Sequence, residues 1–117
     1  MKRIFGLTFM LLGFLTCLQA ATTYNITSNT NWSSSMPSYC SDCIINISTG
    51  VTLTLNNSSQ CYNCTFTGGT LKITSGFAFS SSSISNTTIN ASTSFNMWNS
   101  NSLDNVTLNM TSGSLAP

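Results

Sequence analysis

Short stretches of alternating apolar and polar residues recur along this chain. One set of similar segments begins at residues 40, 61, 84 and 103, so that successive copies are 21, 23 and 19 residues apart. A second set follows, after connections of variable length, at residues 51–55, 69–73, 93–97 and 113–117. Alternation with a period of two residues is typical of a strand with one buried face. Each copy therefore predicts two short strands, and the segment 77–79 offers a third.

The same side-chain types recur at the same positions of each copy. A single copy cannot bury its apolar side, but parallel copies stacked about 4.8 Å apart form a continuous core. We therefore expect an all-β fold, a parallel β-helix (β-solenoid) with about four coils of roughly 21 residues. A two-sheet sandwich is the alternative, but it does not explain the recurrence. The predicted inward columns of the first strand are Cys40/Cys61/Ile84/Leu103, Cys43/Cys64/Thr87/Val106, Ile45/Phe66/Ile89/Leu108 and Ile47/Gly68/Ala91/Met110; those of the second are Leu53/Leu71/Phe95/Leu115 and Leu55/Ile73/Met97.

The chain divides into three parts. Residues 1–20 have a basic start, a short apolar stretch and a small residue at Ala20, which is the pattern of a secretory signal peptide. A lipid-anchored start at Cys17 is the alternative. Residues 21–39 predict a leading strand and a cap containing Trp32, Met36 and Pro37. Residues 40–117 hold the repeats, and because an open solenoid end exposes apolar core, we expect further coils or a partner to cover the C-terminal end.

Charge is almost absent after residue 20. Only Asp42, Lys72 and Asp104 are charged in residues 21–117, and this segment contains no His, Glu or Arg. Nucleic acids and anionic lipids are bound by clusters of Lys and Arg, so neither is an expected partner. The two carboxylates lie near bends of the first and fourth coils, roughly 14 Å apart by strand spacing. Paired catalytic carboxylates lie closer, so we expect a protein without enzymatic activity and without a cofactor.

Four cysteines form the sharpest motif, with the spacing Cys40-x2-Cys43-x17-Cys61-x2-Cys64. This spacing is typical of a four-thiolate zinc site in a cytosolic protein. In an exported chain oxidation is expected instead, and the repeat alone accounts for the spacing. Disulfides are therefore the favoured interpretation, either between coils (Cys40–Cys61 and Cys43–Cys64) or within each pair (Cys40–Cys43 and Cys61–Cys64). Buried free thiols and zinc are the alternatives.

Two polar columns complete the pattern. Asp42, Asn63, Asn86 and Asn105 fall at equivalent bends, where Asn tolerates turn dihedrals and stacked amides can form a hydrogen-bonded ladder. Outward positions of the first strand predict a flat array that could bind ice or a polysaccharide, although Thr also simply suits a solvated strand. The residues of this predicted array are Thr65, Thr67, Thr88, Asn90, Thr107 and Asn109.

The signal-like start, the coils rich in Ser, Thr and Asn, and the inward Ile, Leu and Phe columns resemble the secreted right-handed β-helix regions of bacterial surface and adhesin-like proteins, which have a pectin-lyase-like fold. The resemblance covers residues 22–117 and concerns the composition of the coils and the repeat period, without a diagnostic motif. It implies a non-catalytic extracellular stalk or recognition surface that contacts a glycan or another surface ligand. An ice- or glycan-binding solenoid and the N-terminal part of a β-helical polysaccharide enzyme are the alternatives.

Overall fold

The computed structural model describes residues 21–113 and 115–116, and the backbone alone at the last two. The predicted signal peptide, residues 1–20, and its alternative lipidation site Cys17 lie outside the described residues. The predicted fold class is confirmed, since 58% of the part of the chain that the structure describes is strand, 4% is helix and the parallel strands stack as a β-solenoid. The stack has about five turns instead of four, because residues 21–39 add a turn that contains two strands, the first residue of a third strand and the single-turn helix α2 (Trp32–Ser35).

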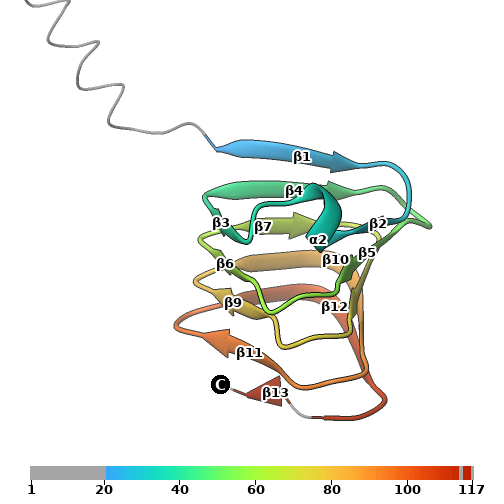
Figure 1. Ribbon diagram of the computed structural model, residues 1–117, viewed down its shortest axis with the longest axis vertical. Coiled ribbons are helices and arrows are strands. Elements are labelled where there is room, and N and C mark those ends of the chain that lie inside the picture. Colours follow the sequence, from blue (N-terminus) through green and yellow to red (C-terminus); the bar gives the residue numbers. More distant parts are fainter. Residues whose placement is uncertain (1–20, 114, 117) are drawn as a thin grey trace, which may run out of the picture.

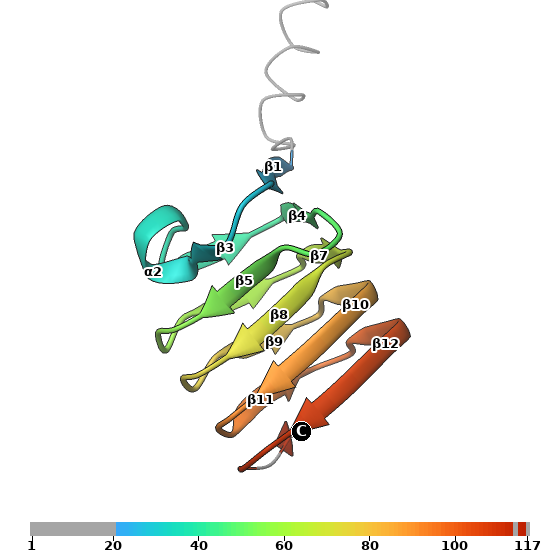
Figure 2. The same ribbon diagram turned by 90° about the vertical axis from the view of Figure 1, so that its right-hand side faces the viewer.

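Three faces surround the core, and all their strand pairs are parallel. Figure 1 shows the strands stacked along the axis of the solenoid, and Figure 2 shows the molecule turned so that one of the three faces points towards the viewer. Face A consists of β1 (Thr22–Ile26), β4 (Cys43–Ile47), β7 (Thr65–Thr67) and the first parts of β10 (Ser83–Ala91) and β12 (Ser102–Met110). Face B consists of β2 (Thr30–Asn31), β5 (Thr52–Leu55), β8 (Thr70–Ile73) and the second parts of β10 and β12. Face C consists of β3 (Tyr39–Ser41), β6 (Gln60–Tyr62), β9 (Ala78–Ser80), β11 (Phe95–Trp98) and β13 (Leu115–Ala116).

A run of aromatic side chains fills the space between the faces. Phe79 lies between Phe66, Phe77 and Phe95, with ring centroids 5.3, 5.0 and 6.0 Å away. Trp32 extends the run, since its ring lies 5.0 Å from that of Phe77, and its indole N–H donates a 2.9 Å hydrogen bond to the carbonyl of Pro37. These rings are at most 1% exposed. Because such large side chains dominate the energetics of a core, this run is what holds successive coils together.

The predicted columns hold between the first and second copies and again between the third and fourth copies, but not between the second and third. Cys40 pairs with Cys61 as expected, but Cys61 then pairs with Phe79, and Ile84 pairs with Phe66. The predicted column Cys40/Cys61/Ile84/Leu103 is therefore wrong at the step from Cys61 to Ile84, whereas Ile84 and Leu103 pair as expected. The segment 84–91 supplies strands to two faces at once: Ile84 continues the column of Ile45 and Phe66 on face A, and Ile89 continues the column of Leu53 and Leu71 on face B. Residues that stack on one another lie between 18 and 23 positions apart along the chain.

Residues with a left-handed backbone mark two of the corners. At the corner from face C to face A, Asp42, Asn63, Ser81 and Asn99 have φ of 56, 54, 49 and 62°. At the corner from face A to face B, Asn86 and Asn105 have φ of 52 and 53°, beside the positive-φ pair Gly68 and Gly69 of the coil before. Asn, Asp and Gly adopt this conformation at the lowest steric cost, which explains why they recur here.

The predicted ladder of four residues is therefore two separate ladders at different corners. Asn63 Nδ2 donates to Asp42 Oδ1 at the first corner, 2.5 Å away, and Asn105 Nδ2 donates to Asn86 Oδ1 at the second, 2.8 Å away. Asn63 and Asn86 belong to different corners and do not stack. The stacking that the sequence predicts at this bend exists, but it is built from pairs.

Candidate functional site

The predicted polar array is divided between two faces. Thr65 and Thr67 lie on face A, where they pair with Ile44 and Asn46 of the coil before. Thr88, Asn90, Thr107 and Asn109 lie on face B and stack as two pairs in β10 and β12. The shift of register between the second and third copies causes this division, so the six residues do not form one surface.

Face B carries a longer array than the sequence predicts. Thr70 of β8 pairs with Thr88 of β10 and with Thr52 of β5, and Thr88 pairs in turn with Thr107. Thr52, Thr70, Thr88 and Thr107 therefore form one threonine column, with steps of about 4.8 Å between strands. A second column lies two residues further along each strand, about 6.6 Å away. Its members are Thr54, Lys72, Asn90 and Asn109.

We call these eight residues the polar array of face B. The alignment of the repeats within the sequence does not identify Thr52, Thr54, Thr70 and Lys72. It aligns residues 69–73 with residues 93–97, whereas residues 70–73 pair with residues 88–91 in the structure. The signal that identifies them is the match of Thr70-Leu-Lys-Ile73 with Thr88-Ile-Asn-Ala91 and then with Thr107-Leu-Asn-Met110. All three segments place a threonine outward, an aliphatic side chain inward, and a long polar side chain outward.

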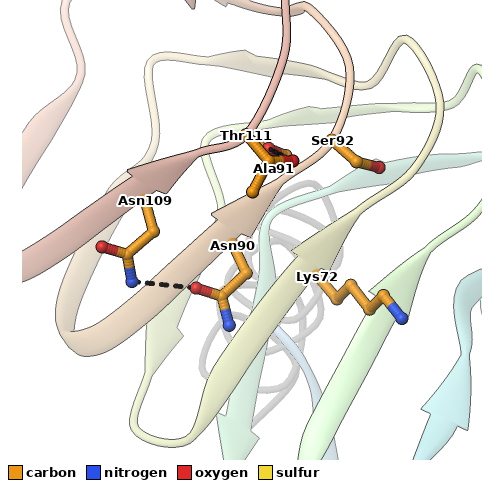
Figure 3. A pocket seen from close by; sticks show the side chains of 6 residues that line it. All are labelled: Lys72, Asn90, Ala91, Ser92, Asn109 and Thr111. Carbon is orange, nitrogen blue, oxygen red and sulfur yellow. Dashed lines mark hydrogen bonds between the residues drawn. The ribbon is translucent and has the colours of Figure 1, made fainter.

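A pocket lies where the second column of the array reaches the end of face B (Figure 3). Lys72, Asn90 and Asn109 line it from three successive strands, together with Ala91, Ser92 and Thr111. Asn109 Nδ2 donates to Asn90 Oδ1 at 2.9 Å, which holds both amides in a fixed orientation. The hydroxyls of Ser92 and Thr111 donate to the carbonyls of Ile73 and Ala91 at 3.4 and 3.3 Å. Their oxygens keep acceptor capacity, but the accessible lining of the pocket is mostly apolar, and the Lys72 ammonium points away from the two amides (Figure 3).

The cysteines lie at the corner between faces C and A. Cys40 and Cys43 form a disulfide with Cα atoms 6.0 Å apart, while Cys61 and Cys64 are free, buried thiols. Of the predicted pairings, the structure has one of the two within-pair bonds and neither of the bonds between coils. Cys61 nevertheless stacks directly on Cys40, and the neighbouring pair Ile44 and Thr65 is in the same register.

The two free thiols interact with each other and with the disulfide. A hydrogen bond from Cys61 lowers the pKa of Cys64, and burial opposes this effect. Burial raises the pKa of Cys61 far above its ordinary value, and the bond to Cys64 adds to the increase. The sulfurs of Cys40, Cys43 and Cys64 lie within 4.8 Å of one another. Because zinc is bound by thiolates, the disulfide sulfurs of Cys40 and Cys43 do not offer the ligands of the four-thiolate zinc site that the spacing leaves as an alternative.

Face C carries exposed aromatic side chains. Tyr39, Tyr62 and Trp98 are 46, 44 and 43% exposed, and the small residues Ala78 and Ser80 lie between their strands. Face C is thus the second surface of the solenoid with side chains suited to contacting a ligand, here by stacking rather than by hydrogen bonding.

Comparison of the chain with protein-family models, curated proteins and solved structures finds no match. Within the described residues, no helix has the length and apolar character needed to cross a membrane.

Proposed function

We propose that this chain is a non-catalytic, adhesin-like module outside the cell, which presents the polar array of face B to an uncharged glycan. The observation that carries the proposal is the register of the array: four threonines stack in one column beside a column of Thr54, Lys72, Asn90 and Asn109. A flat surface with hydroxyls and amides at fixed intervals matches a polymer whose own hydroxyls repeat at fixed intervals.

The chemistry of the array favours a neutral ligand. Hydroxyl and amide groups both donate and accept hydrogen bonds, as sugar hydroxyls do. Lys72 is the single charged residue of the array, so an anionic polymer would meet little complementary charge. The backbone of a solenoid strand is fixed on both sides by its neighbours, so binding costs little conformational entropy in the protein.

The positions of the charged residues support a role without catalysis. Asp42 lies at the corner between faces C and A, and Asp104 lies on face A in the column of Asn46, three coils below it. The two carboxylates are therefore at least about 14 Å apart by strand spacing. Glycosidic carboxylate pairs are about 5–9.5 Å apart. Lys72 lies on face B and cannot complete a pair with either of them.

An extracellular location is supported by two features of different kinds. The first 20 residues have the pattern of an export signal. The disulfide between Cys40 and Cys43 is typical of proteins that fold in an oxidising compartment.

Ice binding is a second candidate function of the same face, and the uninterrupted threonine column favours it. Ordering water over two dimensions needs both columns to be regular, and Lys72 and the asparagines interrupt the second one. Thermal hysteresis of the exported protein distinguishes the two functions. Thermal hysteresis in the wild-type protein that is lost in the variant Thr88→Lys would identify ice, and not a glycan, as the ligand.

The direct test is retention of the exported protein on insoluble neutral polysaccharides, namely β-glucan, mannan and chitin. We expect one of them to retain the protein, and the double variant Thr88→Ala/Asn90→Ala to bind at least about tenfold more weakly, since several hydrogen bonds are lost. The matched control is Thr65→Ala/Thr67→Ala, which removes outward side chains of face A and leaves binding unchanged. Absence of retention on all three polymers, or equal losses in both double variants, would refute the proposal.

A further inference from the structure

Among the residues that the structure describes, the last coil has part of its apolar side exposed. Leu103 and Leu108 continue the inward columns of Ile84 and Ile89, which are each 1% exposed, yet Leu103 and Leu108 are 47 and 40% exposed themselves. Among the described strands, β12 pairs only with β10, so its other edge carries unpaired backbone groups. Long apolar edges of this kind bind another strand.

The first coil leaves a matching edge at the opposite end. Among the described strands, β1 pairs only with β4, and Figure 1 shows it at the far end of the stack from β12. Tyr24 of β1 begins the same inward column that Leu103 ends, since Tyr24 pairs with Ile45 and the column continues through Phe66 and Ile84. A strand like β1 placed below β12 would therefore put a tyrosine over Leu103.

The polar columns have a direction that makes the two ends complementary. In all four asparagine pairs the amide of the later coil donates to the oxygen of the earlier one: Asn46 to Asn25, Asn63 to Asp42, Asn105 to Asn86 and Asn109 to Asn90. A carboxylate only accepts, so the direction at Asp42 is fixed by chemistry.

Asp104 ends the column that Asn25 begins. Asp104 is an acceptor without a donor partner among the described residues. It lies in β12, at the end of the stack where a following coil would supply the donor. Asn25 Oδ1 already accepts from Asn46, and its Nδ2 is a donor without a partner among the described residues.

We propose that a second copy of this chain covers the open end, with its β1 adding in parallel to β12 so that Tyr24 of one copy packs on Leu103 of another and Asn25 donates to Asp104. The interface joins two different surfaces, so each added copy again exposes a free β12 and the assembly grows as a filament. With about five turns in each copy, the axial repeat is about 24 Å. Because separate chains associate, assembly depends on the protein concentration.

Two end-blocking variants test this assembly. Leu103→Asp blocks the β12 end, and Tyr24→Asp blocks the β1 end. In sedimentation velocity, the exported protein is expected to form a ladder of oligomers as its concentration approaches about 1 mM. Each variant alone is expected to stay monomeric, and an equimolar mixture is expected to form heterodimers and nothing larger. Ser102→Asp is the matched control, because it places the same charge on the outward side of β12 and leaves assembly intact.

A third variant tests the register without touching the core. Asn25→Asp keeps the acceptor for Asn46 but removes the donor and places a carboxylate against Asp104, so assembly weakens about tenfold or more. Adding Asp104→Asn restores it, because a carboxylate and an amide then face each other again. A wild-type protein that stays monomeric at every concentration, or blocked variants that stay monomeric when mixed while retaining the wild-type circular dichroism spectrum, would overturn the proposal.

Discussion

Replacement of Phe79 by alanine tests the register of the solenoid. Phe79 is fully buried and packs on three other rings, with centroids 5.0 to 6.0 Å away. Truncation of a buried Phe costs about 3–5 kcal/mol, because transfer energy is lost and a cavity remains. For a domain of this size each kcal/mol lowers Tm by about 4–8 °C, so we expect a fall of more than about 12 °C.

The assay is thermal and urea unfolding of the exported protein, followed by circular dichroism. Trp98→Ala is the matched control, because Trp98 is an aromatic residue on the neighbouring strand that is 43% exposed. We expect it to cost less than about 1 kcal/mol. Phe79→Leu should recover most of the loss, since it refills much of the cavity. If Phe79→Ala costs no more than Trp98→Ala, Phe79 is a residue of a connecting loop and the register described above is wrong.

Three further predictions concern the corners and the cysteines. At Asn86, with φ of 52°, Val is expected to cost about 1–2 kcal/mol and Gly much less, measured by urea unfolding; equal stabilities would contradict the left-handed corner. Gly68→Ala is expected to destabilise by more than about 1 kcal/mol, because its Cβ would lie 2.4 Å from the carbonyl oxygen of Ile47 and its φ is +85°; a Tm unchanged from wild type would refute this contact. Oxidised glutathione, which accepts the two electrons, is expected to form a disulfide between Cys61 and Cys64, because both residues stack in register on the bonded pair Cys40 and Cys43. The intact mass would then fall by two hydrogens. Lasting mixed disulfides with glutathione would show that these thiols cannot reach each other.

The fold could be predicted from the sequence because its two signals are local. Alternation with a period of two gives the strands, and recurrence of the same side-chain types gives the stacking. An error in register leaves both signals intact, because the apolar and polar residues of a strand still alternate when the strand is assigned to the wrong face. The coil formed by residues 21–39 was harder to recognise as a repeat, because a helical turn at Trp32 replaces part of the pattern.

The register could not be predicted because two corners use the same chemistry. Asn63-Cys-Thr-Phe and Asn86-Thr-Thr-Ile both place a left-handed Asn before an inward residue, an outward Thr and a large apolar side chain. One segment turns from face C into face A and the other from face A into face B. Only the residues stacked above and below distinguish the corners, and those are distant in sequence.

The same ambiguity explains the outcome for the candidate site. Four of the six predicted array residues lie on face B, and Thr65 and Thr67 lie on face A. The threonine column depends on the pairing of Thr70 with Thr88, which the alternation of apolar and polar residues alone does not predict. The cysteines, by contrast, were identified from spacing alone, because their two copies precede the shift in register.

The measurement that tests the proposed function most directly is an amide chemical-shift titration of the isotopically labelled, exported protein with a soluble oligosaccharide of the polymer that retains it. If face B binds the glycan, the shifts are confined to its strands and are largest around Lys72, Asn90 and Asn109. Shifts centred on Tyr62 and Trp98 of face C, or no shifts at saturating oligosaccharide, would contradict the account.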